Sequence, residues 1–254
     1  MPTPALALYH VPDLPLVDAD TDLAAVIAAA ISAAGLQPRT GDVLAVAQKI
    51  VSKAEGCQVD LNDISPSAEA RELAQDGDKD PRLVELILRE SRRVVRHNAG
   101  VIIVEHRLGI VLANAGIDRS NVAGDEDTVL LLPKDPDVSA ALLRKTLEEF
   151  FGVRLGILIT DSVGRPWRLG TTGIAIGCAG ITALTDMRGQ VDMFGRVLQV
   201  AEVATADCIA GAAGLIMGEG AEAVPVVLVR GIDAGESNQN AKTILRPENE
   251  NLFQ

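Results

Sequence analysis

Aromatic residues are scarce in this sequence: they make up 2% of its 254 residues, as four Phe, one Trp and one Tyr. RNA-binding and single-strand-binding modules stack bases on aromatic rings, so the shortage argues against both classes. The core must be built from Val, Leu, Ile and Ala instead. Hydrophobic residues amount to 48% and charged residues to 23%, a balance typical of a globular chain and not of a disordered one.

Positive charge is also in short supply. There are 23 Lys and Arg against 35 Asp and Glu, a net charge of -12. A general nucleic-acid binder needs a basic face against the phosphates, so we expect no nucleic-acid partner. The longest nearly apolar run, residues 23–36, is interrupted by Ser32 and is shorter than the ~20 residues that span a bilayer. We therefore expect no membrane partner.

Cysteine is rare, and no two of Cys57, Cys178 and Cys208 form a C-x-x-C pair. Their odd number and wide spacing fit neither a disulfide framework nor a zinc site, and favour small buried thiols in a reducing compartment. The N-terminus lacks the basic and long apolar regions of a signal peptide. These features predict a cytoplasmic protein.

Two common nucleotide-binding signatures are missing, because the chain contains neither a P-loop nor a Gly-x-Gly-x-x-Gly after a strand. Ser162 also lacks the Gly-x-Ser-x-Gly setting of a hydrolase nucleophile. Four glycines recur at spacings of three and four: Gly170, Gly173, Gly177 and Gly180. This repetition is as compatible with tight backbone packing as with phosphate binding.

Apolar periodicity and turn residues predict a set of helices and strands. Helices are expected at 20–34 (with Asp20 or Thr21 as N-cap), 65–75, 80–92, 139–151 and 201–217. Strands are expected at 43–47, 101–104, 109–112, 156–160 and 225–229. Because the two kinds alternate only in part, a mixed α/β sheet with flanking helices is favoured over a Rossmann array. We expect a single domain over 1–254, in two interleaved subdomains.

Asp161 is the most informative single residue, because it follows the expected strand at 156–160. Open α/β sheets bind ligands beyond the carboxyl ends of their strands. With Ser162 it offers hard oxygen ligands for Mg²⁺ or Mn²⁺, while Arg165 and Arg168 could hold carboxylates or phosphates. An Asx-type turn with surface arginines is the alternative interpretation.

Asp118 and Asn121 lie in a Gly-containing polar loop after another apolar run, where Asp118 could bind a metal and Asn121 a nucleotide or sugar. A simple Asn- and Gly-rich turn is equally compatible. Lys49 and Lys53 follow the strand at 43–47 and could hold a polyphosphate, or be merely solvated. Glu219 could be another carboxylate ligand, or belong to a helix C-cap and turn.

A basic cluster precedes the central strands: Arg89, Arg92, Arg93 and Arg96. It could steer anions, although a solvated helix face is the simpler interpretation.

Taken in order, these segments resemble one family, the coenzyme F-420-0:L-glutamate ligases, also called gamma-glutamyl ligases. The resemblance is carried by blocks between Leu14 and Gly231, at 41–56, 79–85, 113–122, 131–137, 160–168 and 192–196. Each block is modest by itself, and the order and spacing of the blocks make the match specific.

The resemblance implies a GTP-dependent enzyme that joins L-glutamate to a deazaflavin coenzyme precursor, first at the lactyl carboxylate and then through gamma-glutamyl links. It also implies a homodimer that uses two Mg²⁺ or Mn²⁺ ions per site and K⁺. The nitroreductase-like second domain of some relatives is not expected, because this chain is too short to hold one.

Site residues are implied in the same way. The metal ligands would be Asp118, Asp161, Ser162 (where many members have Thr) and Glu219. The GTP site would be lined by Leu14, Pro15, Leu16, Val17, Gln48, Lys49, Lys53, Asn121, Met217, Gly218, Glu219, Gly220, Ala221, Glu222, Ala223 and Val224.

Elementary chemistry agrees with such a reaction. A carboxylate is a poor electrophile, so amide formation requires activation, plausibly as an acyl phosphate made from the GTP γ-phosphate. Metals at Asp118 and Asp161 would neutralise the transferring phosphoryl group, and Arg165 or Arg168 would hold a substrate carboxylate. The alternatives are a metal-dependent phosphotransferase or phosphatase acting on another small acid, and a non-catalytic binding module.

Overall fold

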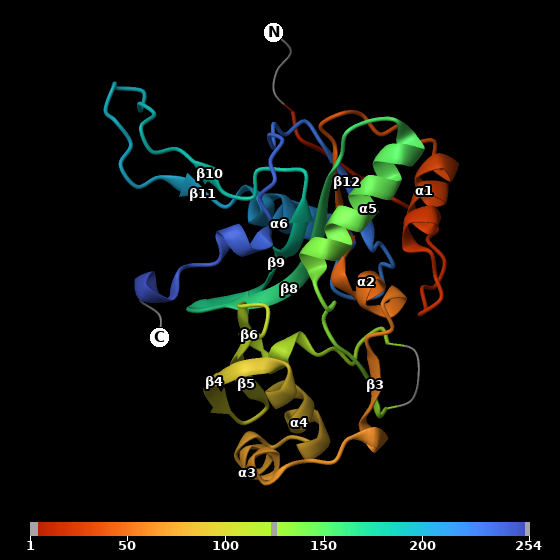
Figure 1. Ribbon diagram of the computed structural model, residues 1–254, viewed down its shortest axis with the longest axis vertical. Helices are drawn as coiled ribbons and strands as arrows, with labels where there is room; N and C mark the ends of the chain where they lie inside the picture. The colour runs from red at the N-terminus through yellow and green to blue at the C-terminus, as the bar shows by residue number, and fades with distance from the viewer. Residues whose placement is uncertain (1–4, 123–125, 252–254) are drawn as a thin grey trace.

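The computed structural model describes residues 5–122 and 126–251. A five-stranded sheet lies at its centre (Figure 1), in the order β1 (Ala7–His10), β12 (Val226–Arg230), β2 (Val43–Ala47), β8 (Gly156–Arg165) and β9 (Arg168–Ala179). Only the β2–β8 pair is parallel, and the other neighbours in this sheet are antiparallel. The predicted mixed α/β class is confirmed.

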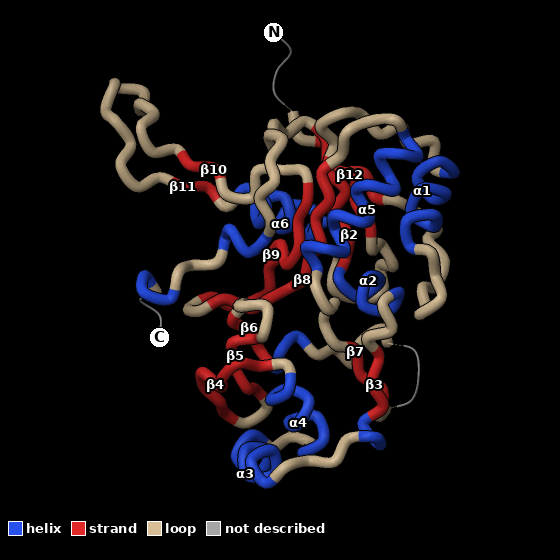
Figure 2. The backbone as a smooth tube through the Cα atoms, in the orientation of Figure 1, coloured by secondary structure: helices blue, strands red, loops and turns tan. Residues whose placement is uncertain are grey.

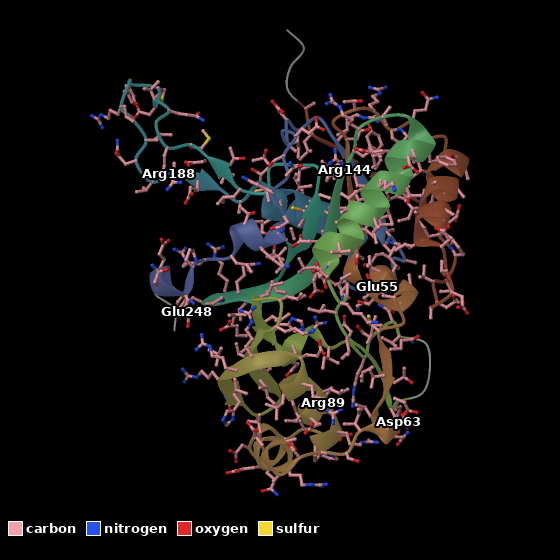
Figure 3. The ribbon with its side chains drawn as sticks, in the orientation of Figure 1. Glu55, Asp63, Arg89, Arg144, Arg188 and Glu248 are labelled. Atoms are coloured by element: carbon pink, nitrogen blue, oxygen red, sulfur yellow. The ribbon has the colours of Figure 1, made fainter. Side chains whose placement is uncertain are left out.

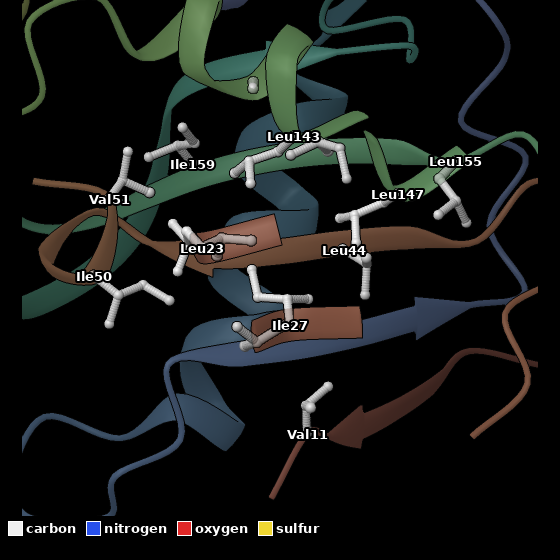
Figure 4. Close-up of a cluster of buried hydrophobic side chains, with 14 of the residues drawn as sticks. Val11, Leu23, Ile27, Leu44, Ile50, Val51, Leu143, Leu147, Leu155 and Ile159 are labelled. Atoms are coloured by element: carbon white, nitrogen blue, oxygen red, sulfur yellow. The ribbon is translucent and has the colours of Figure 1, made fainter. Parts of the chain in front are cut away.

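Helices cover both faces of this sheet. Alternate residues of a strand point to opposite faces, and both faces of β2 and β8 are buried. Leu44 and Ile159 pack in one cluster with α1 (Leu23–Ala33) and α5 (Pro136–Phe151), seen in Figure 4. Val43 and Leu158 pack on the other face with α6 (Thr205–Met217). The core is aliphatic, as the composition predicts.

The glycines of β9 serve tight packing. A Cβ at Gly173 would collide with the carbonyl oxygen of Ala210 in α6, and one at Gly177 would collide with the carbonyl oxygen of Pro136 in α5. The backbone of β9 therefore lies directly against a helix on each face. This contact supports the packing interpretation of the glycine repeat at these two positions.

Below the main sheet, a smaller antiparallel sheet is formed by β4 (Ser91–Asn98), β5 (Val101–His106) and β6 (Val111–Ala113). It packs against α3 (Ala68–Gly77) and α4 (Pro81–Arg89) around a separate apolar cluster. Figure 2 shows β3 (Gln58–Asp60) and β7 (Thr128–Leu130) beside it as a short pair. The remaining pair is β10 (Thr185–Asp186) and β11 (Glu202–Val203). Residues 185–203, which these two strands enclose, form an arm that projects from the molecule (Figure 1).

Several predicted boundaries differ from the structure. Asp22 caps α1, not Asp20 or Thr21, because its carboxylate accepts the Ala25 N–H at 3.0 Å. The Thr21 hydroxyl is instead engaged in a local turn, where it donates to Asp18 at 2.8 Å. The expected helix at 201–217 begins only at Thr205, and the strand expected at 156–160 continues to residue 165.

The prediction of a helix over 80–92 is wrong in its last turn. The helix ends at Arg89, and β4 follows, with β-branched residues at 94 and 95 that favour a strand. The basic cluster is therefore not one solvated helix face. Arg92 and Arg93 instead donate to Glu105 on the neighbouring strand, at 3.2 and 2.8 Å.

The three cysteines form no disulfide in the described part of the chain. Cys57 and Cys178 are buried, as expected, whereas Cys208 is exposed, which contradicts the expectation of three buried thiols. In residues 5–122 and 126–251, no helix is both long enough and apolar enough to cross a bilayer. The division into two interleaved subdomains stays a prediction.

Candidate functional site

The candidate site lies where the parallel strands β2 and β8 stop pairing, at the Ala47–Thr160 pair. The next residues are Gln48, the first residue of α2 (Gln48–Ala54), and Asp161. Strand β12 begins at this same end, because the Ala47 N–H donates to the Pro225 carbonyl at 2.8 Å. The segment before Pro225 and the exit of two parallel strands therefore meet at one edge, which is the usual place for a ligand in such sheets.

A distant segment brings Asp118 to this edge. Its backbone forms a bridge with Leu130, with both N–H to O distances at 2.9 Å. Its carboxylate accepts a hydrogen bond from Gln48 Nε2 at 3.0 Å and lies 3.4 Å from Lys49 Nζ. Gln48 is buried and is oriented by the Ser52 hydroxyl, which donates to Gln48 Oε1 at 2.9 Å. Gln48 therefore positions Asp118.

Both lysines of α2 are partnered, which contradicts the interpretation of simple solvated lysines. Lys49 donates to the Ser120 hydroxyl at 2.9 Å, and Lys53 donates to the Asn121 carbonyl at 2.7 Å. The Asn121 side chain donates to the Gly220 carbonyl at 3.2 Å. These bonds join α2, the 118–121 segment and the 217–224 segment. Burial, and then the charge of Lys49, lower the pKa of Lys53.

Burial and nearby carboxylates raise the pKa values of the two aspartates at this edge. Burial and then the charge of Asp118 raise the pKa of Asp161 to about 7, against the opposing effect of the Ser162 N–H, which donates to Asp161 at 2.9 Å. Burial also raises the pKa of Asp118. Glu219 adds to both shifts and accepts a hydrogen bond from Thr171 at 3.3 Å. We call Asp118, Asp161 and Glu219, with Gln48 and Lys49, the carboxylate edge.

The chemistry of the carboxylate edge fits a divalent cation. Carboxylates are hard oxygen donors, and a cation would offset the burial and the Asp118 charge that together raise the pKa of Asp161. The side chains are not already gathered around one point, however. Among the described residues, no three His, Cys, Asp or Glu side chains stand close enough together to hold one ion. The four predicted metal ligands stay a prediction.

Sequence comparison identifies the family of this chain. A model of the family described as F420-0:Gamma-glutamyl ligase matches residues 13–231, which include the whole edge. The chain belongs to this family. Relatives named Coenzyme F420:L-glutamate ligase include that of Methanothermobacter thermautotrophicus, 43% identical over 98% of this chain and 98% of its own length. Those of Methanopyrus kandleri and Methanocaldococcus jannaschii are both 44% identical, over 98% and 84% of each chain respectively.

The remaining site residues predicted from the gamma-glutamyl ligase resemblance are spread more widely. Leu14 and Val17 pack against the core cluster under α1, whereas Leu16 is 96% exposed. Residues 14–17 follow Val11, whose N–H donates to the Val226 carbonyl. The chain therefore leaves the main sheet at the end that carries the candidate site. In the 217–224 segment, Glu222 turns back to accept the Gly220 N–H at 2.7 Å.

Arg165 and Arg168 lie at the tip of the β8–β9 hairpin, where they pair with each other in register. Because β8 continues past Asp161, Arg165 is four residues further along the strand, roughly 13 Å at the spacing of an extended chain. Neither guanidinium has a hydrogen bond or ion pair with any residue that the structure describes. Trp167, between them, is 84% exposed. Their predicted catalytic role stays a prediction.

The Ser162 side chain is also placed in an unexpected direction. Asp161 and Ser162 pair with successive residues of β9, Ile174 and Gly173, without a bulge between them. Consecutive strand residues project from opposite faces, so the Ser162 hydroxyl points away from the Asp161 carboxylate. What Ser162 contributes to Asp161 in this structure is its backbone N–H.

Sequence reasoning missed three hydroxyl groups that contact the site residues. Ser52 orients Gln48, Ser120 accepts from Lys49, and Thr171 donates to Glu219. Ser120 could have been found, because it lies two residues after Asp118 in the same polar loop. Thr171 carries no local signal, since it reaches Glu219 only through the β8–β9 hairpin.

Proposed function

We propose that this protein is a GTP-dependent ligase that adds L-glutamate to a coenzyme F-420 precursor, first at the lactyl carboxylate and then through gamma-glutamyl links. The observation that carries the proposal is the carboxylate edge: Asp161 directly follows the parallel pair β2–β8, and Asp118, bonded by Gln48, lies beside Lys49. Relatives that share about 40% of the sequence carry the name of such a ligase.

The proposed reaction proceeds through an acyl phosphate. The substrate carboxylate attacks the GTP γ-phosphate and GDP leaves; the glutamate amine then attacks the acyl carbon, and phosphate leaves. Two Mg²⁺ or Mn²⁺ ions, held by Asp118, Asp161, Ser162 and Glu219, would neutralise the charge of the transferring group. No protein nucleophile is needed. The K⁺ ion that the family resemblance implies is also part of the proposal.

The chain's own residues bind and orient the substrates. Lys49, within the carboxylate edge, and Lys53, one turn further along α2, place ammonium groups where they would offset phosphate charge. Asn121, residues 14–17 and residues 217–224 surround the same end of the sheet and are the proposed GTP contacts. Arg165 and Arg168, at the hairpin tip, would bind a substrate carboxylate away from the phosphoryl group.

A homodimer is part of the proposal, and the arm supports it. Figure 3 shows Arg188 in the arm, far from Glu55 near the end of α2. Five apolar side chains of the arm are more than half exposed: Val191, Met193, Phe194, Val197 and Val200. Exposed apolar groups that gather in one segment are typical of a protein interface. Replacing Met193 and Phe194 by Ser should therefore give a monomer in light scattering, and an unchanged dimer would remove the arm from the interface.

Product analysis tests the reaction. The protein is incubated with GTP, Mg²⁺ and L-glutamate, with and without the deazaflavin precursor, and the products are weighed by mass spectrometry. A ligase adds the mass of one glutamyl residue, which is glutamate less one water, to the precursor, and it forms GDP only when both glutamate and the precursor are present. GDP formation without any glutamate adduct would instead support a phosphotransferase or phosphatase, and nucleotide binding without turnover would support a binding module.

A further inference from the structure

The register of β9 against β8 shifts by one residue next to the carboxylate edge. Consecutive residues 159 and 160 of β8 pair with Gly177 and Ala175, which leaves Ile176 as an extra residue in β9. Such an extra residue is a β-bulge, which bends its strand and is common beside active sites. Asp161 is the next residue of β8, so the bulge lies where the hairpin begins to carry the candidate site.

The bulge allows β9 to pack tightly against two helices. Gly173 and Gly177 are four residues apart, so in a regular strand both would face the same side of the sheet. In this protein Gly173 lies against α6 and Gly177 lies against α5, on the opposite face. Ile176 packs in the α5 cluster beside Gly177, so two successive residues face that side. The outer part of β9, residues 168–175, therefore presents its glycine to α6 only while the bulge stays at this position.

Two aspartates hold β9, one on each side of the bulge. Asp207, in the first turn of α6, accepts the Ala175 N–H at 2.9 Å. Asp137, in the first turn of α5, accepts the Cys178 N–H at 3.0 Å. A carboxylate at this place in a helix is favoured by the partial positive charge of the helix N-terminus. Each helix therefore binds the backbone of the strand that it covers.

Only the α6 side of the bulge leads to the candidate site. Ile174 pairs with Asp161, and Thr171, further along β9, donates its hydroxyl to Glu219 at 3.3 Å. Glu219 lies just after the last residue of α6. The outer part of β9 is therefore held at both ends of α6, by the carboxylate in its first turn and by Glu219 beyond its last.

We propose that Asp207 is a positioning residue for the ligation reaction: its hydrogen bond to Ala175 fixes the bulge, and the bulge fixes where the hairpin holds Asp161. The inference rests on the proposed function for the reaction in which Asp161 acts. Without Asp207, the N–H of the buried residue Ala175 loses its acceptor, which a buried donor tolerates poorly. A bulge that moves by one residue turns the neighbouring β9 side chains to the opposite face. Asp207 therefore acts through the strand and not on the substrate.

The variants are Asp207→Ala and Asp207→Asn, with Asp137→Ala as the matched control on the other side of the bulge. Burial raises the pKa of Asp207, so its charge is unfavourable there, and a neutral Asn can accept the same N–H. We expect Asp207→Ala to lower the kcat of glutamate addition roughly 10- to 100-fold, the effect of misplacing a reacting group by about 1 Å. The KM values should change little, and Asp207→Asn should recover most of the kcat.

The control separates positioning from stability. Asp137→Ala should keep the kcat of the unchanged protein even if it lowers the melting temperature as much as Asp207→Ala does. Equal kcat values in Asp207→Ala and Asp137→Ala would overturn the inference. An Asp207→Asn variant as slow as Asp207→Ala would also overturn it, because the hydrogen bond would then not be what matters.

Hydrogen exchange measured by mass spectrometry tests the same bond without turnover. Asp207→Ala should speed exchange on the order of tenfold in residues 171–175 and in their partners, residues 160–164, because a hydrogen bond is lost locally. Residues 177–179 should respond to Asp137→Ala instead. Faster exchange spread evenly over the main sheet would contradict the inference, because Asp207 would then only stabilise the fold.

The two measurements distinguish failure of the inference from failure of the proposed function. If exchange follows the expected local pattern in a protein that makes no glutamate adduct, the proposed function fails while the hold of Asp207 on the bulge stands. If the protein makes the adduct and Asp207→Ala makes it at the unchanged rate, the inference alone fails.

Discussion

Two groups of carboxylates in this protein have opposite surroundings. Around the small sheet, the His106 imidazole, 3.4 Å away, and Arg107 hold the pKa of Glu90 below its usual range, and hydrogen bonds from Arg93 and Arg92 do the same for Glu105. At the carboxylate edge, burial raises the pKa values of Asp118 and Asp161, and each of these has another carboxylate nearby. The positive partners of the two glutamates outweigh the effect of burial on their pKa, whereas at the carboxylate edge burial outweighs the effect of Lys49.

This difference separates carboxylates that stabilise the fold from carboxylates that are available to bind a ligand. Paired carboxylates gain from ionisation in the folded state, so they support the structure directly. Carboxylates whose pKa is raised by burial make the folded state less stable when ionised, and such groups gather at functional sites, where a ligand can supply positive charge. The sign of the pKa shift therefore separates Glu90 and Glu105 from Asp118 and Asp161.

The largest expected effect comes from Asp161→Asn. It removes a hard anionic ligand from the phosphoryl-transfer site, and we expect turnover to fall by roughly 100- to 1000-fold, the range of catalytic electrostatic effects. The melting temperature should equal or exceed that of the unchanged protein, because a disfavoured buried charge has been removed. Asp63→Asn is the control, on an exposed carboxylate that Figure 3 shows away from Glu55. A strongly lowered melting temperature would place Asp161 in the structural group instead.

A smaller effect is expected from Gln48→Ala, which removes the amide that holds Asp118. Residues that orient a ligand group from behind change activity by roughly 10–100-fold. We expect kcat to fall within that range while the KM for GTP changes little, and Ser52→Ala to cause a weaker effect in the same direction, because it only orients Gln48. An unchanged kcat in Gln48→Ala would show that Asp118 needs no such support.

Glu90→Gln tests the structural group. Glu90 bonds Arg107 at 2.7 Å and lies 3.4 Å from the buried His106 Nε2, so its loss should cost about 1–3 kcal/mol of unfolding free energy. Because the folded pKa of Glu90 lies below the ordinary 4.5, this stability is present above pH 4.5 and is lost as the pH falls through the folded pKa. Denaturant titrations of both proteins between pH 3 and 7 should therefore converge at the acid end. A difference that persists there would mean that packing, not charge, is responsible.

The smallest effect is expected from Arg92→Gln. The Arg92 side chain is 58% exposed, and Glu105 keeps a second partner in Arg93. Exposed ion pairs contribute little in water, so the unfolding free energy should change by less than about 0.5 kcal/mol. Denaturant unfolding in low and high salt measures this change. A loss of more than about 1 kcal/mol of unfolding free energy would show that the strand pairing depends on the Arg92 charge.

Part of the site could be predicted because local signals marked it. Asp161 and Gln48 follow apolar runs that form the parallel pair β2–β8, and carboxyl ends of parallel strands meet at one edge by geometry. Other features had no such signal. The helix predicted over 80–92 extends two residues into β4, because the arginines there carry no strand signal until β5 lies beside them and Glu105 accepts from Arg93. The distance between Arg165 and Asp161 depends on how far β8 continues in its hairpin.

The sequence by itself determined an aliphatic core, a mixed α/β class and membership of the gamma-glutamyl ligase family, since composition, periodicity and the order of motifs are properties of the chain. That the charge of Asp118 reaches Asp161, and that α2 holds Asp118 in place, follow only from the tertiary structure. Each of these relations joins segments about 40 to 70 residues apart. Their charges interact because folding brings the segments within a few ångströms and removes water from between them, and neither change can be read from the order of residues.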